Sequence, residues 1–180
     1  MAFNENTRVK IPAILHLCRL GYTYLPLSSV IWDESTNIAP LIFAESIKRI
    51  NSEVENLDTG RLLQDISLEL NNEDLGEAFY KRLVSPNTPK IIDFENFEKN
   101  SFHVVTELTY VNGEDEFRPD ITLLINGMPL AFIEVKKPNN QEGVLAERER
   151  INARFSNKKF RRFINITQLL VFSNNMEYDL

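Results

Sequence analysis

The sequence predicts an α/β fold in which a mixed central sheet is flanked by helices and preceded by an α-rich N-terminal half. Before about residue 85, apolar residues recur at the i, i+3, i+4 spacing that is typical of helices. Beyond the stretch SPNTPK, β-branched and aromatic residues alternate with polar ones, as in half-buried strands. We therefore expect the core to run helix, three strands, helix, strand.

In the N-terminal half, the helical pattern covers residues 7–20, 39–51, 60–70 and 74–84. Pro12 falls inside the first pattern, so that helix is expected to start near it or to kink there, and Gly21 suits its C-terminal end. Cys18 lies in the apolar run AILHLCRLGY and is expected to be a buried structural thiol. The stretch SSVIWDESTNIAP, which holds Trp32, predicts an irregular connection.

In the C-terminal half, strands are expected over residues 102–111, 117–125 and 128–136, joined as a meander by turns at VNGED and ING. Helical periodicity returns over residues 141–155. The apolar run ITQLLVFSN then predicts a fourth, buried strand.

Length and composition predict one globular domain over residues 1–180, with a helical part at 1–88 and a sheet with a basic helix at 89–180. The sequence has no run of 18 apolar residues and no signal-peptide layout at its start, so we expect a cytoplasmic protein without a membrane span. One cysteine and two histidines exclude an internal disulfide and a zinc site.

The charge is unevenly distributed. Residues 136–162 hold nine Lys and Arg against three Glu, a net +6, whereas the chain as a whole carries −6, so the remainder carries −12. An acidic body with one basic segment is suited to hold a polyanion beside that segment. The alternative is a solvated helix face.

The stretch EFRPDITLLINGMPLAFIEVKKPN reads as a β-hairpin with an Asn-Gly turn, yet charges occupy the end away from the turn. Asp120 opens the first strand, and Glu134 and Lys136 interrupt the second. Burying unpaired charges costs several kcal/mol. We therefore expect these three charges to neutralise one another around a metal ion.

The three residues match the pattern P-D…(D/E)-x-K, here RPD followed by EVK. The carboxylates of Asp120 and Glu134 and the backbone carbonyl of Val135 offer three oxygen ligands to a hard cation such as Mg²⁺. Glu134 and Lys136 share a face of their strand. The lysine is thus placed to orient or deprotonate an attacking water and to offset charge on a phosphate. The alternative is a surface ion pair on an edge strand.

Register decides whether these two carboxylates meet. In an ideal hairpin around Asn126 and Gly127, Asp120 would oppose Ile133 and point away from Glu134. A metal site therefore requires a bulge or a longer loop within residues 125–130, for which Pro129 offers a cause, or broken pairing at Asp120. We expect the carboxylates to converge within about 5 Å.

At these residues the sequence resembles the PD-(D/E)XK nuclease superfamily, and within it the N-terminal nuclease domain of type I restriction enzyme R subunits. RPDITLLINGMPLAFIEVKKP resembles the catalytic hairpin of that family, QLLVFSN its following strand, and NENTRVKIPAILHLCRLGY its first helix. The resemblance implies a restriction-endonuclease-like αβββαβ core. It also implies Mg²⁺-dependent cleavage of double-stranded DNA, in a complex with methyltransferase and specificity subunits, after an ATP-driven motor has translocated the DNA.

The chain has no G-x-x-x-x-G-K-[ST] motif, so ATP is expected to act elsewhere and the chain to be part of a larger R subunit. The resemblance makes Asp120 and Glu134 metal ligands and Lys136 the catalytic lysine. Glu5 matches an acid that many superfamily members place near the metal, although a first-turn acid favoured by the helix dipole is the alternative. The expected DNA-binding residues are Lys137, Arg148, Arg150, Arg154, Lys158, Arg161 and Arg162.

The sequence departs from the family at the Q-x-x-x-Y motif, which aligns with Ile151 and Phe155. Arg150 or Arg154 is a candidate to take over the DNA contact of that motif, because guanidinium suits phosphate. Two other functions stay open: a non-catalytic docking module with the same fold, and a stand-alone repair or junction nuclease.

Overall fold

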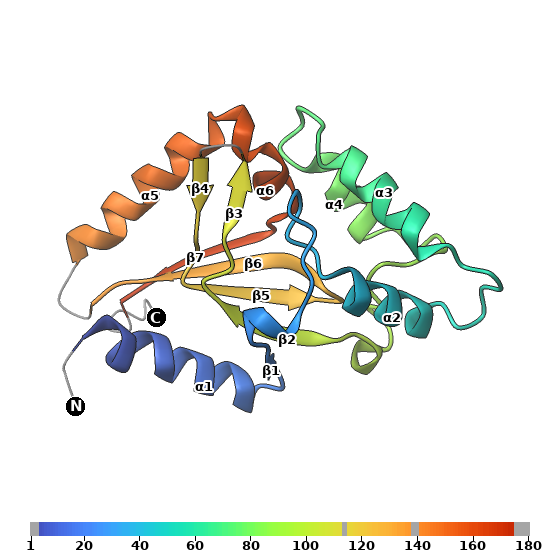
Figure 1. Ribbon diagram of the computed structural model, residues 1–180, viewed down its shortest axis with the longest axis horizontal. Helices are drawn as coiled ribbons and strands as arrows, with labels where there is room; N and C mark the ends of the chain where they lie inside the picture. The colour runs from blue at the N-terminus through green and yellow to red at the C-terminus, as the bar shows by residue number, and fades with distance from the viewer. Residues whose placement is uncertain (1–3, 113–114, 138–140, 175–180) are drawn as a thin grey trace.

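A computed structural model describes residues 4–112, 115–137 and 141–174 (Figure 1). Its central sheet has five strands in the order β1-β2-β5-β6-β7. Their bounds are β1 (Thr23–Tyr24), β2 (Phe102–Thr106), β5 (Ile121–Ile125), β6 (Met128–Val135) and β7 (Leu169–Ser173). Strands β2, β5 and β6 are antiparallel neighbours, whereas β1 and β7 join the two edges in parallel. The predicted mixed sheet and the three-strand meander are confirmed.

The helices of the described residues surround this sheet. They are α1 (Ile11–Arg19), α2 (Pro40–Ile50), α3 (Thr59–Glu69), α4 (Glu77–Leu83), α5 (Gln141–Phe155) and α6 (Arg161–Ile166), with a π-helical segment η1 (Asn6–Lys10) and 3-10 turns η2 (Leu27–Ser29), η3 (Phe97–Lys99) and η4 (Lys158–Phe160). The helices expected from periodicity are confirmed. Strand β1 and helix α6 were not predicted, because each is too short to show a period.

The π-helical segment η1 runs directly into α1, and Pro12 is the second residue of α1, so the change from π to α geometry falls next to the proline. Gly21 follows the end of α1 with a φ of 105°, as a left-handed terminating residue should. Cys18, however, is exposed. The prediction of a buried thiol was wrong, because the apolar run that holds it faces the sheet on only one side of the helix.

The expected strand at 102–111 is two strands. Glu107 adopts a φ of 58°, which ends β2, and the chain then leaves the sheet to form β3 (Tyr110–Asn112). The expected strand at 117–125 divides in the same way into β4 (Asp115–Phe117) and β5. Strands β3 and β4 pair with each other as a separate ribbon. Both breaks fall beside the charged end of the predicted hairpin.

Helices cover both faces of the sheet and one of its ends (Figure 1). Helix α1 packs on the face that holds Val104, Ile121 and Val135. The ribbon, α5 and the segment around Phe160 and Phe163 pack on the opposite face. Helices α2, α3 and α4 enclose the turn end of the hairpin. The charged end of the hairpin therefore lies away from the main core.

Strand β7 lies at the edge of the sheet, where Leu169 is exposed and the other residues are partly buried. The expectation of a buried strand was wrong on this point, because no strand of the described residues pairs with one long side of β7.

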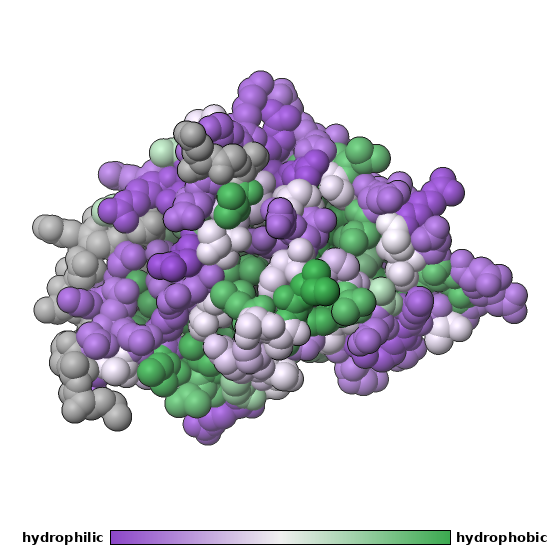
Figure 2. Space-filling model, viewed as in Figure 1, coloured by the Kyte–Doolittle hydropathy of each residue, from purple (hydrophilic) through white to green (hydrophobic). Residues whose placement is uncertain are grey.

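The face shown in Figure 2 is mostly hydrophilic, including the side formed by α5. Hydrophobic side chains gather over its middle. Among the described residues, no helix combines the length and the apolar character that crossing a membrane requires.

Candidate active site

The hairpin of β5 and β6 contains the irregularity that the metal site requires. Ile125 pairs with Met128 and Leu124 with Pro129, but Leu123 pairs with Ala131, so Leu130 is an extra residue in β6. The predicted bulge is confirmed, at Pro129 and Leu130. From there outward the ladder ends with Ile121 paired with Ile133, and Asp120 and Glu134 are the next residue on each side.

A buried network holds the turn of this hairpin. Asn126 and Gly127 both have positive φ values, 52° and 78°, as a two-residue type I′ turn demands. The Asn126 amide donates to the carbonyl of Ile91 and to Asn100 Oδ1, and its oxygen accepts from the Ser101 N–H. Because the turn is fixed to two other segments, at Ile91 and at Asn100 and Ser101, the register of the strands beyond it is fixed as well.

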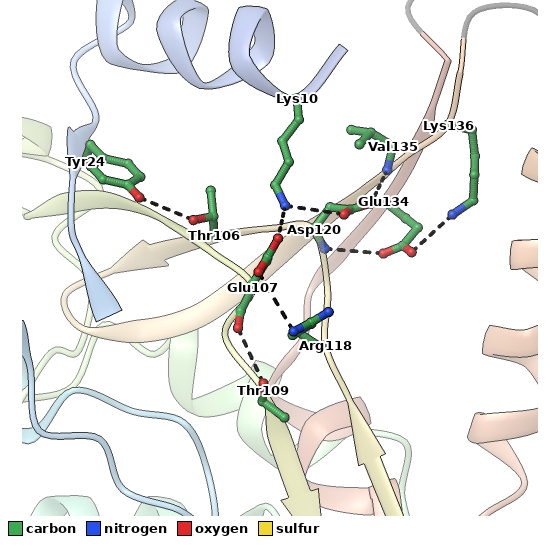
Figure 3. Close-up of polar contacts among 10 residues, drawn as sticks. All are labelled: Lys10, Tyr24, Thr106, Glu107, Thr109, Arg118, Asp120, Glu134, Val135 and Lys136. Carbon is green, nitrogen blue, oxygen red and sulfur yellow. Dashed lines mark hydrogen bonds and ion pairs between the residues drawn. The ribbon is translucent and has the colours of Figure 1, made fainter. Parts of the chain in front are cut away.

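Asp120 is held through its backbone and its side chain (Figure 3). Its carbonyl accepts from the N–H of Glu107 at 3.2 Å, and its Oδ2 accepts from the N–H of Val135 at 3.0 Å. Its own N–H donates to Glu134 Oε2 at 3.4 Å. The two carboxylates are therefore oriented by the backbone of the opposite strand, before any ligand arrives.

Glu134 is buried, and Lys136 Nζ lies 3.4 Å from its Oε1. The two residues share a face of β6 with Phe132, two residues earlier. The structure thus brings together Asp120, Glu134 and Lys136 as the sequence motif predicted. That the carboxylates converge within about 5 Å stays a prediction.

Two residues at this place were missed by the sequence analysis, Lys10 and Glu107. Lys10 Nζ lies 2.7 Å from Glu107 Oε1 and 3.6 Å from Asp120 Oδ1 (Figure 3). The hydrogen bond from Lys10 holds the pKa of the Glu107 carboxyl below its ordinary value. One signal was present in the sequence: Glu107 interrupts the run FHVVTELTYV, which is otherwise suited to a strand.

The donor set fits a hard divalent cation. The carboxylates of Asp120 and Glu134, with side chains that are 22% and 11% exposed, both lie at the end of the hairpin, and Mg²⁺ is commonly held by one or two carboxylates together with waters and substrate phosphates. Among the described residues, no three Asp, Glu, His or Cys side chains cluster in a way that could hold a metal. Glu5 is partly exposed at the start of η1, and its role as a ligand stays a prediction.

The seven residues of the expected DNA-binding face fall into three sets. Lys137, Arg148 and Arg150 have exposed side chains. Arg154 lies over the ring of Phe117, 3.9 Å from its centre. The remaining three lie at or beyond the C-terminal end of α5, where Lys158 and Arg161 pair with Glu73 and Arg162 donates to Asn71 Oδ1.

The position of the missing glutamine is occupied by a core residue. Ile151 is 2% exposed and packs among the aromatic side chains of the α5 face, whereas Phe155 is 40% exposed. In this chain the inward side of α5 thus serves packing at that position rather than contact with a ligand.

Replacing Ile151 with glutamine should therefore destabilise the protein. Burying an amide without partners, and losing the apolar side chain, should lower the free energy of unfolding by about 2 to 4 kcal/mol. Urea unfolding measures the change. The control, Phe155→Tyr, should stay within about 0.5 kcal/mol because that ring is largely exposed. An Ile151→Gln protein as stable as the wild type would contradict this view of α5.

The fold and the paired carboxylates define an α/β protein of nuclease-like architecture. A family model described as type I restriction enzyme R protein N terminus matches residues 2–179. The chain belongs to this family.

Three curated relatives from Methanocaldococcus jannaschii agree with that assignment. The chain is 28% identical over 200 residues to the "Putative type I restriction enzyme MjaIXP endonuclease subunit", a match that covers 97% of this chain and 19% of the relative. It is 41% identical over 61 residues to the MjaVIIIP subunit, which is named in the same form; this match covers 34% of the chain and 6% of the relative. It is 45% identical over 47 residues to the corresponding MjaVIIP subunit, a match that covers 26% of the chain and 4% of the relative. The chain thus spans about a fifth of the length of the first of these relatives.

Proposed function

We propose that the chain is a Mg²⁺-dependent endonuclease domain of the PD-(D/E)XK type, which hydrolyses phosphodiester bonds in double-stranded DNA. The observation that carries the proposal is the bulge at Pro129 and Leu130, because it shifts the register by one residue and the ladder, continued past Ile121 and Ile133, brings Asp120 and Glu134 to the same side of the sheet. Pro129 accounts for the bulge locally, and the register that results is the one that a shared cation site requires. The family, whose relatives are named endonuclease subunits, supports the same function.

In this proposal Asp120, Glu134 and the carbonyl of Val135 hold the cation. A bound Mg²⁺ supplies Lewis-acid polarisation of the phosphate and lowers the pKa of a coordinated water. Lys136, on the same strand face as Glu134, orients the attacking water and offsets the negative charge that develops on the phosphate. The backbone bonds of Asp120 keep both carboxylates in place during the reaction.

The wider activity is proposed on the family relationship. A motor elsewhere in a longer R protein uses ATP to translocate DNA, and methyltransferase and specificity subunits select the target in the cytoplasm. A docking module without catalysis accounts less well for two facing carboxylates and a partly buried lysine, because such charges cost stability when they have no ligand.

A cleavage assay tests the proposal. Covalently closed circular DNA is incubated with the R protein that contains this chain, its partner subunits, Mg²⁺ and ATP. Linear or nicked product supports the proposal. Circles that remain intact while ATP is hydrolysed would contradict it, since the motor would then run without a nuclease.

The basic residues are proposed to bind the DNA backbone. Neutralising all seven, namely Lys137, Arg148, Arg150, Arg154, Lys158, Arg161 and Arg162, should weaken binding by the same factor on unrelated duplexes, because phosphate contacts carry no base information. The slope of log affinity against log salt should become shallower by about one for each phosphate that the protein no longer neutralises.

Two smaller sets separate the contributions. Replacing Lys137, Arg148 and Arg150 should account for most of the change, because the positive charge of Lys158 and Arg161 is partly offset by Glu73. Replacing Lys48 and Lys81, on α2 and α4, is the control for net charge alone. If the slope of log affinity against log salt stays at the wild-type value in the sevenfold variant, the basic residues do not contact DNA phosphates and only face solvent.

A further inference from the structure

The ammonium group of Lys10 lies between two carboxylates at the candidate site. Lys10 is only 8% exposed, and its Nζ lies 2.7 Å from Glu107 Oε1 and 3.6 Å from Asp120 Oδ1. A buried ammonium is costly unless it is paired. These two acids therefore serve as counter-charges for Lys10, and one of them is a proposed metal ligand.

The two contacts of Lys10 differ in strength. The contact with Glu107 is a short hydrogen bond, whereas the contact with Asp120 is longer than a hydrogen bond and rests on charge alone. A second cation that approaches Asp120 repels Lys10 and displaces the weaker of these contacts first. Glu107 then still holds the ammonium.

Glu107 is itself fixed with respect to Asp120. Its φ of 58° is unusual for a residue with a side chain, and its N–H donates to the carbonyl of Asp120 at 3.2 Å. Arg118 Nη1 lies 3.9 Å from its other carboxylate oxygen, Oε2 (Figure 3). The backbone that ends β2 thus places an acid where it binds Lys10 beside Asp120.

We propose that Lys10 and Glu107 set the affinity of the carboxylate site for divalent cations. Lys10 acts as the resident counter-ion of Asp120 and competes with an incoming cation, while Glu107 holds the ammonium and limits that competition. Both are positioning residues that act through Asp120. The inference rests on the proposed function, because it concerns the same two carboxylates.

Two substitutions should change the affinity in opposite directions. Lys10→Met removes the competing charge at similar length, so the dissociation constant for Mg²⁺ should fall about three- to tenfold. Glu107→Gln leaves Lys10 without its main partner and should raise that constant by a similar factor. Titration calorimetry of the full chain with MgCl₂ measures the dissociation constants of both variants. A titration with MnCl₂, followed by electron paramagnetic resonance, repeats the measurement with a second cation.

The double variant distinguishes a positioning role from direct ligation. If Glu107 acts through Lys10, Glu107→Gln should have a much smaller effect in the Lys10→Met background. An equal loss of affinity in both backgrounds would make Glu107 a direct ligand and overturn the proposal. The controls are Lys81→Met and Glu77→Gln, an exposed ion pair on α4, which should leave the constant unchanged.

A purely structural role for Lys10 predicts a different result. A Lys10→Met chain that stays folded by circular dichroism and binds Mg²⁺ no more tightly than the wild type would overturn the inference. Glu107 is half exposed, so Glu107→Gln gives a second test that does not depend on how the core tolerates methionine at position 10. A wild-type chain that binds neither ion would overturn the proposed function and this inference with it. The same holds if Asp120→Ala binds both ions as tightly as the wild type.

Discussion

Replacing Lys136 with alanine is expected to lower the rate of DNA cleavage by about 10²- to 10³-fold, the usual loss when one group that stabilises developing charge is removed. Asp120→Ala and Glu134→Ala should abolish cleavage, because each removes a ligand of the proposed cation. The assay uses the R protein with its partner subunits, Mg²⁺ and ATP. Retained nicking in any of the three variants would defeat the assignment of these residues.

The loss should be catalytic rather than structural. The three side chains lie at the end of the hairpin, outside the cluster enclosed by α2, α3 and α4, so each variant should stay folded, with a free energy of unfolding lowered by about 1 to 2 kcal/mol. Removing one acid also relieves repulsion between the two. Asp120→Asn keeps an acceptor for the Val135 N–H, and Glu134→Gln keeps one of the two acceptor oxygens of Glu134; both keep the shape of the side chain and guard against local distortion.

Matched controls are available in the same chain. Lys90, which is partly buried, and the exposed Glu95 form a pair with the same 3.4 Å separation as Lys136 and Glu134, but lie outside the site. Lys90→Ala and Glu95→Ala should cleave DNA at the wild-type rate. Equal losses in the two pairs would mean that the assay reports general damage to the protein.

Gly127→Ala should strongly destabilise the protein. A Cβ at this position would lie 2.8 Å from both the carbonyl oxygen of Ala39 and the backbone nitrogen of Phe43, and the φ of 78° is unfavourable for alanine. Backbone atoms cannot rotate aside, so strain and overpacking should together cost about 3 kcal/mol. The thermal midpoint should fall by roughly 6 to 12 °C.

Gly21→Ala is the matched control. Gly21 also has a positive φ, 105°, but no atom lies within 4 Å of the position that a Cβ would take, so only the backbone strain applies. Its cost should be about 1 kcal/mol. Thermal and urea unfolding measure both variants. An equal loss of stability in the two would mean that the close contact of Gly127 with Ala39 and Phe43 does not hold the hairpin turn.

The register of the hairpin was predictable because it follows from counting. Given a turn at Asn126 and Gly127, alternation along the strands puts Asp120 and Glu134 on opposite faces unless one residue is added. Pro129 cannot donate to a strand ladder, and the bulge occurs there and at Leu130. The requirement that two carboxylates share a cation at one end of the hairpin thus predicted a bulge near the turn at the other end.

Lys10 and Glu107 could not be predicted in the same way. Nearly a hundred residues separate them, and no periodicity relates a helix start to the end of a distant strand. The break at Glu107 depends on a backbone hydrogen bond to Asp120, which exists only in the assembled sheet. The same limit applies to Cys18 and Leu169, whose exposure depends on what the rest of the fold leaves uncovered.

The central claim is that Asp120 and Glu134 bind one divalent cation. The most direct measurement is an anomalous difference map from crystals of this chain grown with Mn²⁺, with an Asp120→Ala crystal as the control. The proposed function predicts a peak within about 2.6 Å of an oxygen of each carboxylate in the wild type, which is lost in the variant. A wild-type crystal grown at saturating Mn²⁺ that shows the peak elsewhere, or shows no peak at these carboxylates, would contradict it.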